Sequence, residues 1–281
     1  MNRTRLFAIV ICASIVACIF WVGRKTSAFE PRPAAANAPA KGNAAETNES
    51  SLSQAALKRL KPEAASRVAE LNAMLNQRGN DKQRTALLEQ LSFVYDSLGE
   101  YGLSGLYAER LAEATNNTGT WFVAATQFTN ALQFAQSESE KGFYISGGKK
   151  SARRVLAAEP ENLKAKNLLA ECIISESDDS IMTVIPMLKA IEAKDSNNRQ
   201  ALHNLAMLSR KSGQTDKAIK RFTKLTKLEP LNAEYHFSLA ELLEETGDKK
   251  GASDSYKKCL PLMKDGPEKK TIEKKVLELQ P

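Results

Sequence analysis

GQTDKAIKRF (Gly213–Phe222) and GDKKGASDSY (Gly247–Tyr256) share a spacing that decides the fold. Their first glycines are 34 residues apart. The same interval separates Ala218 from Ala252, Phe222 from Tyr256, Leu205 from Leu239, and Ala206 from Ala240. Such an interval indicates either two equivalent binding positions or one structural unit stacked on the next. The small residues favour stacking, because they let helix backbones approach closely.

The interval has the length of a helical hairpin. From about Ala55 onward the apolar residues follow helical spacing, and no convincing run of alternating β-branched residues occurs. Two antiparallel helices joined by tight turns fill about 34 residues. One pair cannot bury its apolar face alone, so pairs are expected to stack. Gly213 and Gly247 are each expected to end the first helix of a pair, with the glycine backbone in the left-handed conformation.

These residues resemble the tetratricopeptide-repeat family. The resemblance implies an all-α fold, a right-handed superhelical solenoid of antiparallel helix pairs, over residues 85–266. The expected units are 85–117, 118–162, 163–198, 199–232 and 233–266. It is strongest in the last two, and weaker upstream because extra residues interrupt 118–162 and lengthen a turn in 163–198.

The two ends of the array are expected to be covered by single helices. Residues 53–84 are interpreted as a lead or capping helix. Residues 267–281 are interpreted as a C-terminal capping helix, with Ile272, Val276 and Leu279 on one face.

The N-terminus contains an uncharged run of 18 residues, Leu6–Gly23, flanked by basic residues. As a helix it approaches the ~30 Å thickness of a bilayer core, so residues 1–28 predict a transmembrane signal-anchor. Thr26-Ser27-Ala28 leaves a cleaved signal peptide open, and Ile15–Cys18 loosely resembles a lipoprotein box. The Ala/Pro-rich stretch 29–52 predicts a flexible linker.

These features predict a single-pass membrane protein whose repeat domain lies in the periplasm or otherwise outside the cytoplasm.

No arrangement of residues indicates catalysis, a metal or a cofactor. The four cysteines form no CxxC pair, and the only histidines are His203 and His236. Gly147-Gly148 lacks the flanking residues of a phosphate-binding loop. The net charge of +7 is not concentrated with aromatic residues, so a nucleic-acid partner is not favoured. The chain is therefore not expected to be an enzyme.

The resemblance implies that first helices line a concave groove that binds a protein or peptide. The positions carried over from the family are Phe122, Thr126, Asn167, Glu171, His203, Met207, Arg210, Phe237, Glu241 and Glu244. A specialised branch of the family clamps a terminal carboxylate, but only Asn204 agrees with that pattern here, which argues against such a ligand.

A basic stripe is expected on the second helix of unit 199–232. Its members are Lys217, Lys220, Arg221, Lys224 and Lys227. Ala218, Phe222 and Leu225 of this helix face the core, so the basic side chains are predicted to point outward. They form either a solvated convex face or a contact with anionic lipid.

The leading hypothesis is a membrane-tethered scaffold that binds a protein or peptide in the groove. The alternative is an accessory factor that assembles a membrane or envelope enzyme complex, for example in cytochrome biogenesis. A third hypothesis, nucleic-acid binding through the basic stripe, predicts steep salt dependence.

Overall fold

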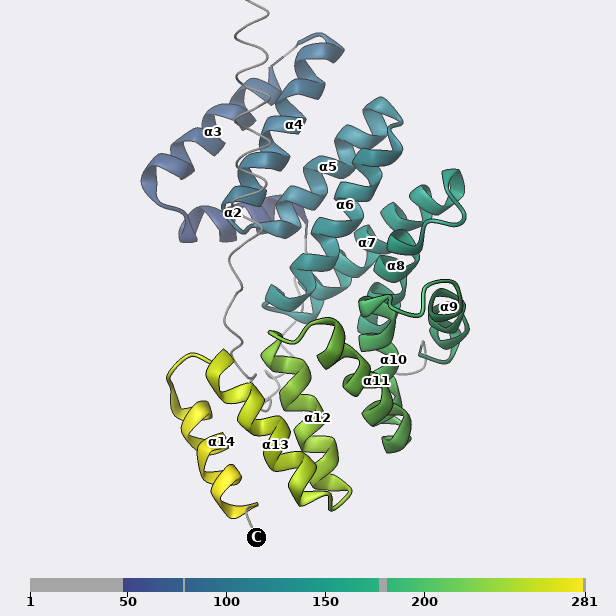
Figure 1. Cartoon of the computed structure of the whole chain (residues 1–281). Helices are drawn as coiled ribbons and strands as arrows, with labels where there is room; N and C mark the ends of the chain where they lie inside the picture. The colour runs from purple at the N-terminus through teal and green to yellow at the C-terminus, as the bar shows by residue number, and fades with distance from the viewer. Residues whose placement is uncertain (1–47, 78, 177–180, 280–281) are drawn as a thin grey trace, which may run out of the picture. The chain divides into compact units, whose positions relative to one another are not determined.

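The computed structural model describes residues 48–77, 79–176 and 181–279. Every regular element within these ranges is an α-helix or a short 3-10 helix, and none is a strand, which confirms the predicted all-α class (Figure 1). The chain divides into two compact units, with the boundary after Arg221. The described residues 48–221 are called the N-terminal unit and 222–279 the C-terminal unit.

The localisation predicted from the sequence needs correction. Within the described ranges no helix is both long enough and apolar enough to cross a membrane, so the predicted single-pass membrane protein with an extracytoplasmic repeat domain is not upheld. The predicted anchor, Leu6–Gly23, and most of the predicted linker lie outside the described residues.

The N-terminal unit consists of successive helices joined by short connections. They are α2 (Glu49–Arg59), α3 (Pro62–Asn76), α4 (Asp81–Ser97), α5 (Tyr101–Thr115), α6 (Thr118–Ala131), η1 (Leu132–Phe134), α7 (Glu138–Ala158), α8 (Leu163–Glu176), α9 (Ile181–Lys194), α10 (Arg199–Lys211) and the first part of α11 (Thr215–Leu228). Helices α4 and α5, α6 and α7, and α8 and α9 pack as hairpins, and each hairpin packs on the next (Figure 1).

The C-terminal unit contains the rest of α11 and one further hairpin. Its elements are α12 (Ala233–Glu245), α13 (Lys249–Cys259), η2 (Leu260–Leu262) and α14 (Pro267–Glu278). Ala240, Ala252 and Tyr256 form its core with Ile272 and Val276 of α14. Helix α14 therefore covers the last hairpin with its apolar face.

The recurring small and aromatic residues are the packing surfaces of the hairpins. The alanines at the 34-residue interval are Ala206, Ala218, Ala240 and Ala252, and all four have no exposed surface. Phe222 and Tyr256 are equally buried. Close backbone approach thus explains the alanines, and aromatic rings fill the space beside them.

Glycines end the first helices as the sequence predicts. Gly213 and Gly247 have φ values of 71° and 83°, and Gly99 at the end of α4 has 74°. The following amide donates back to the third-last helical carbonyl at each turn, for example from Gln214 to Ser209 over 2.8 Å. Glycine adopts this left-handed conformation without steric cost, so each hairpin can turn tightly.

Asparagines begin the first helices, a regularity that the sequence interpretation missed. The side-chain oxygens of Asn80, Asn117, Asn162, Asn198 and Asn232 accept hydrogen bonds from the backbone amides at the starts of α4, α6, α8, α10 and α12. Each such cap stabilises its helix by about 1 kcal/mol, because it satisfies an otherwise unpaired amide.

Helix α2 begins earlier than expected and is fastened to α5. It starts at Glu49, inside the predicted linker 29–52, and the region predicted as one lead helix, 53–84, holds most of α2, all of α3 and the start of α4. The Glu49 carboxylate makes a bidentate ion pair with Arg110, at 2.6 and 2.8 Å. This contact, with buried Leu52 and Ala56, docks α2 on the array.

The extra residues of unit 118–162 form η1 and lengthen α7 to 21 residues. Inside this hairpin Phe128 of α6 is fully buried and packs against two glycines. A Cβ atom on Gly147 would lie 2.5 Å from the Phe128 ring, and one on Gly105 would lie 3.0 Å away. Gly147 therefore serves packing, which gives a physical reason for a glycine in the middle of a helix.

Substituting Gly147 tests this close packing. Gly→Ala at an open helical position usually stabilises a protein by about 1 kcal/mol. We expect Gly147→Ala instead to lower the free energy of unfolding by about 1–3 kcal/mol, because the methyl group overlaps the Phe128 ring. Urea unfolding followed by circular dichroism measures the difference.

The matched control is Gly142→Ala, also in α7, where a Cβ atom meets nothing within 4 Å. We expect it to be neutral or stabilising by up to about 1 kcal/mol. Equal stabilities of the two variants would contradict the packing role of Gly147.

Candidate functional site

The first helices α6, α8 and α10 carry seven of the predicted ligand residues within the N-terminal unit. Helix α8 contacts both α6 and α10, so the three helices are neighbours in one layer. We call the following residues the first-helix face: Phe122, Thr126, Glu171, Gln200, His203, Met207 and Arg210. Their exposure and partners decide which of them are available to a ligand.

Helix α6 contributes an aromatic edge. Phe122 is half-buried and packs against the cluster around Trp121 and Val155. The Thr126 hydroxyl donates to the carbonyl of Phe122 over 2.9 Å, so its hydrogen is used within the helix. Phe122 can therefore offer apolar contact, while Thr126 can only accept a hydrogen bond.

Asn167 of α8, one of the predicted ligand residues, is buried and makes a structural contact. Its side chain is 6% exposed, and its Nδ2 donates to Asn198 Oδ1 over 2.9 Å. Asn198 also caps α10. The pair therefore joins α8 to the start of α10 and leaves little surface for a partner.

Glu171 lies at the junction of α8 and α10. Gln200 Nε2 donates to Glu171 Oε2 over 2.6 Å, and His203 is close enough to interact electrostatically. Burial raises the pKa of the Glu171 carboxyl, and His203 opposes that change only in part. The carboxylate is thus held in an environment that disfavours its charge.

Helix α10 contributes the most exposed apolar group of the face. Met207 lies one turn after His203, and its side chain is 42% exposed. Arg210 is half-buried on the same helix. A methionine in this position gives a deformable apolar contact on the same helix as Gln200 and His203.

The predicted residues of the C-terminal unit are engaged by their own chain. The Glu244 carboxylate binds Lys275 of α14 and the Tyr256 hydroxyl, each over 2.8 Å. The Lys275 hydrogen bond is the main reason why the pKa of Glu244 is lowered. Phe237 packs edge-on against Tyr256 with ring centroids 6.0 Å apart, and Glu241 is half-buried. Lys275 of α14 therefore already pairs with the Glu244 carboxylate.

The basic stripe of α11 is not uniformly directed outward. Arg221 is 17% exposed in its side chain and pairs with Glu192 of α9 over 3.2 Å. Lys217, Lys220 and Lys227 are exposed, whereas Lys224 is half-buried. Arg221 is thus a packing residue, which corrects the predicted continuous stripe.

Gln200 was missing from the predicted ligand positions. A sequence signal existed, because Gln200 lies three residues before His203 and seven before Met207 on one helix, so all three share a face. Its bond to Glu171 could not be inferred, because it depends on how closely α8 and α10 pack.

Comparisons with known proteins agree with this architecture. Residues 203–262 match the family model described as tetratricopeptide repeat, which supports the predicted family resemblance for that segment. No curated protein matches the sequence significantly.

Two solved structures of MamA have a similar fold. The RS-1 ArsTM double mutant of MamA is 16% identical, with a TM-score of 0.50, and the match covers 66% of this chain and 96% of that one. MamA from residue 41 to its end, from Desulfovibrio magneticus RS-1, is 17% identical with the same TM-score, covering 66% and 97%. At such identities the likeness concerns the fold alone.

Replacing the Glu171 carboxylate tests its environment. The pKa of Glu171 is raised in the folded state, so ionisation of this carboxyl lowers the free energy of unfolding at pH values above that pKa. Below the ordinary value of 4.5 the carboxyl is neutral in both states, and the loss of stability disappears. We expect Glu171→Gln to raise the Tm by about 2–4 °C near pH 7. The gain should vanish as the pH falls below 4.5, because the wild-type carboxyl is then neutral too.

Differential scanning calorimetry across this pH range measures the effect, and Glu89→Gln, at an exposed glutamate of α4, is the control. A gain in Tm that is independent of pH would mean that removal of the charge is not its cause.

Proposed function

We propose that this protein is an interaction module that binds a protein or peptide segment on the first-helix face of α6, α8 and α10. The tetratricopeptide-repeat match and the stacked hairpins support a protein-binding role without catalysis. A rigid helical layer also favours binding, because its side chains are ordered before a partner arrives.

Glu171 is the observation that carries the proposal. Burial raises the pKa of its carboxyl group, which makes the charged form unfavourable. Its described partners are the neutral amide of Gln200 and the side chain of His203. A lysine or arginine from a partner would supply the missing positive charge and offset that cost. The partner segment is therefore expected to be basic at the position that meets Glu171.

Apolar side chains lie on α6 and α10, the two helices that contact α8 with its Glu171. Met207 on α10 is 42% exposed, and Phe122 on α6 is half-buried. A partner with a large apolar side chain near its basic residue would cover Met207. Such a central apolar contact carries much of the affinity in protein interfaces.

Random-sequence peptides displayed on phage provide a probe that assumes no partner. The full chain should enrich peptides that combine a lysine or arginine with a large apolar residue. We expect Met207→Lys to weaken binding of a synthetic enriched peptide by at least about tenfold in fluorescence anisotropy, because it removes apolar contact and repels the basic residue.

Met182→Lys is the matched control, since Met182 is 74% exposed on the second helix α9. It should leave the affinity unchanged. The proposal fails if Met207→Lys and Met182→Lys have equal effects, or if Glu171→Gln leaves the affinity unchanged.

A further inference from the structure

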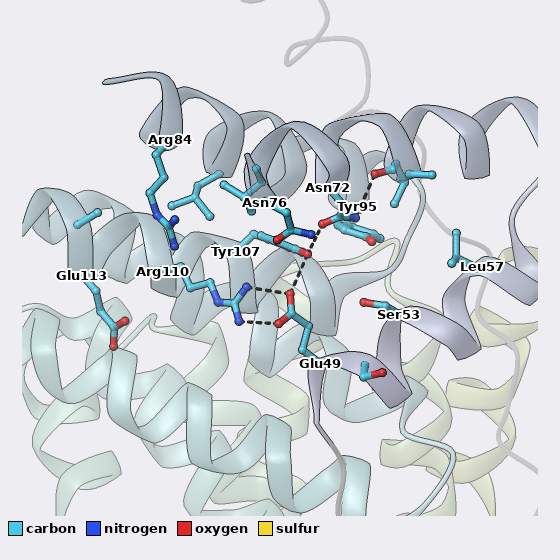
Figure 2. A pocket seen from close by; sticks show the side chains of 16 residues that line it. Glu49, Ser53, Leu57, Asn72, Asn76, Arg84, Tyr95, Tyr107, Arg110 and Glu113 are labelled. Atoms are coloured by element: carbon cyan, nitrogen blue, oxygen red, sulfur yellow. Dashed lines mark hydrogen bonds and ion pairs between the residues drawn. The ribbon is translucent and has the colours of Figure 1, made fainter. Parts of the chain in front are cut away.

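A cavity of about 960 Å³ lies at the start of the N-terminal unit, away from the first-helix face. Its walls come from α2, α3, α4 and α5, as Figure 2 shows. The volume is within the range of about 300–1,000 Å³ that is usual for small-molecule sites. The proposed interaction function makes no use of this cavity.

One carboxylate already lies in the cavity, and it belongs to the chain itself. Glu49 of α2 is held by both guanidinium nitrogens of Arg110 and lies 2.9 Å from the Tyr107 hydroxyl. Burial raises the pKa of Glu49, but the hydrogen bonds from Arg110 and Tyr107 outweigh it and lower the pKa overall. The cavity is thus built to stabilise a carboxylate at this position.

A second guanidinium in the same cavity has no counter-ion among the described residues. Arg84 extends from α4 into the cavity near Arg110, as Figure 2 shows, and its side chain makes no ion pair or hydrogen bond with any described residue. Glu113 also lines the wall, but its carboxylate binds Lys150 over 2.7 Å. Arg84 is therefore available to an anion from outside.

A buried hydroxyl is a further polar group of the cavity. Tyr95 lines the cavity and is fully buried, and its hydroxyl makes no hydrogen bond of ordinary geometry within the described ranges. Such an unsatisfied group is costly, so it usually has a partner. Ser53 and Asn72 lie near this hydroxyl, on the side of the cavity opposite Arg84 (Figure 2).

Leucine side chains also line the cavity. Leu75 and Leu88 lie in the part of the wall next to Arg84, and Leu57, which is 40% exposed, lies on the side opposite Arg84 (Figure 2). A purely inorganic anion would leave Leu75 and Leu88 uncovered. A ligand with an anionic head and an apolar body would use both parts.

We propose that this cavity binds a small organic carboxylate, whose head pairs with Arg84 and whose apolar body lies over Leu75 and Leu88. The bidentate pair between Glu49 and Arg110 shows the same head-group chemistry a short distance away.

The probe is 3-phenylpropionate, with its neutral amide as the matched compound, titrated into the full chain by calorimetry. We expect saturable binding of the carboxylate and binding of the amide at least about tenfold weaker. Arg84→Met should lower the affinity for the carboxylate to that for the amide. Because Arg84 is exposed and has no described partner, this variant should keep its fold, which circular dichroism verifies.

Arg153→Met, at an exposed arginine of α7, is the control and should leave binding unchanged. Methyl NMR signals of Leu75 and Leu88 should shift on addition of the carboxylate more than those of Leu57. The proposal is overturned if neither compound binds, if the amide binds as well, or if Arg153→Met matches Arg84→Met. The proposal is also overturned if inorganic phosphate at the same concentration displaces the probe, since the site would then accept any anion.

Discussion

A helical hairpin has apolar surface on two sides and can bury only one of them by itself. This constraint explains why the N-terminal unit is continuous, because each hairpin from α4 to α9 must lie against the next. The helices approach closely where alanine or glycine stands at the crossing. Ala125, Ala152 and Ala170 have no exposed surface, and Phe128 fits against Gly147.

The same packing determines what the first-helix face can offer. Since α8 and α10 are pressed together, Asn167 is buried between them and Glu171 is placed beside Gln200. The face therefore contains a carboxyl group, Glu171, whose pKa is raised by burial, and an exposed methionine, Met207.

The first and last helices cover the apolar surface of their neighbouring hairpins to different extents. At the C-terminus α14 covers the last hairpin with Ile272 and Val276 and binds Glu244 through Lys275. At the N-terminus α2 is held by ion pairs from Glu49 to Arg110 and from Arg59 to Glu100, and by buried Leu52 and Ala56. Less complete coverage there leaves the open cavity beside Arg84.

The sequence by itself determined the helical class, the glycine turns and the buried alanines that recur at 34 residues. These depend on periodicity and turn chemistry, which act between residues close together in the chain. Only the tertiary structure decided that Asn167 is buried, that Glu244 binds Lys275, that Arg221 binds Glu192, and that Glu49 enters the Arg110 site. Each of these contacts joins residues from different helices, so it depends on where the packed helices place their side chains and not on the spacing within any one of them.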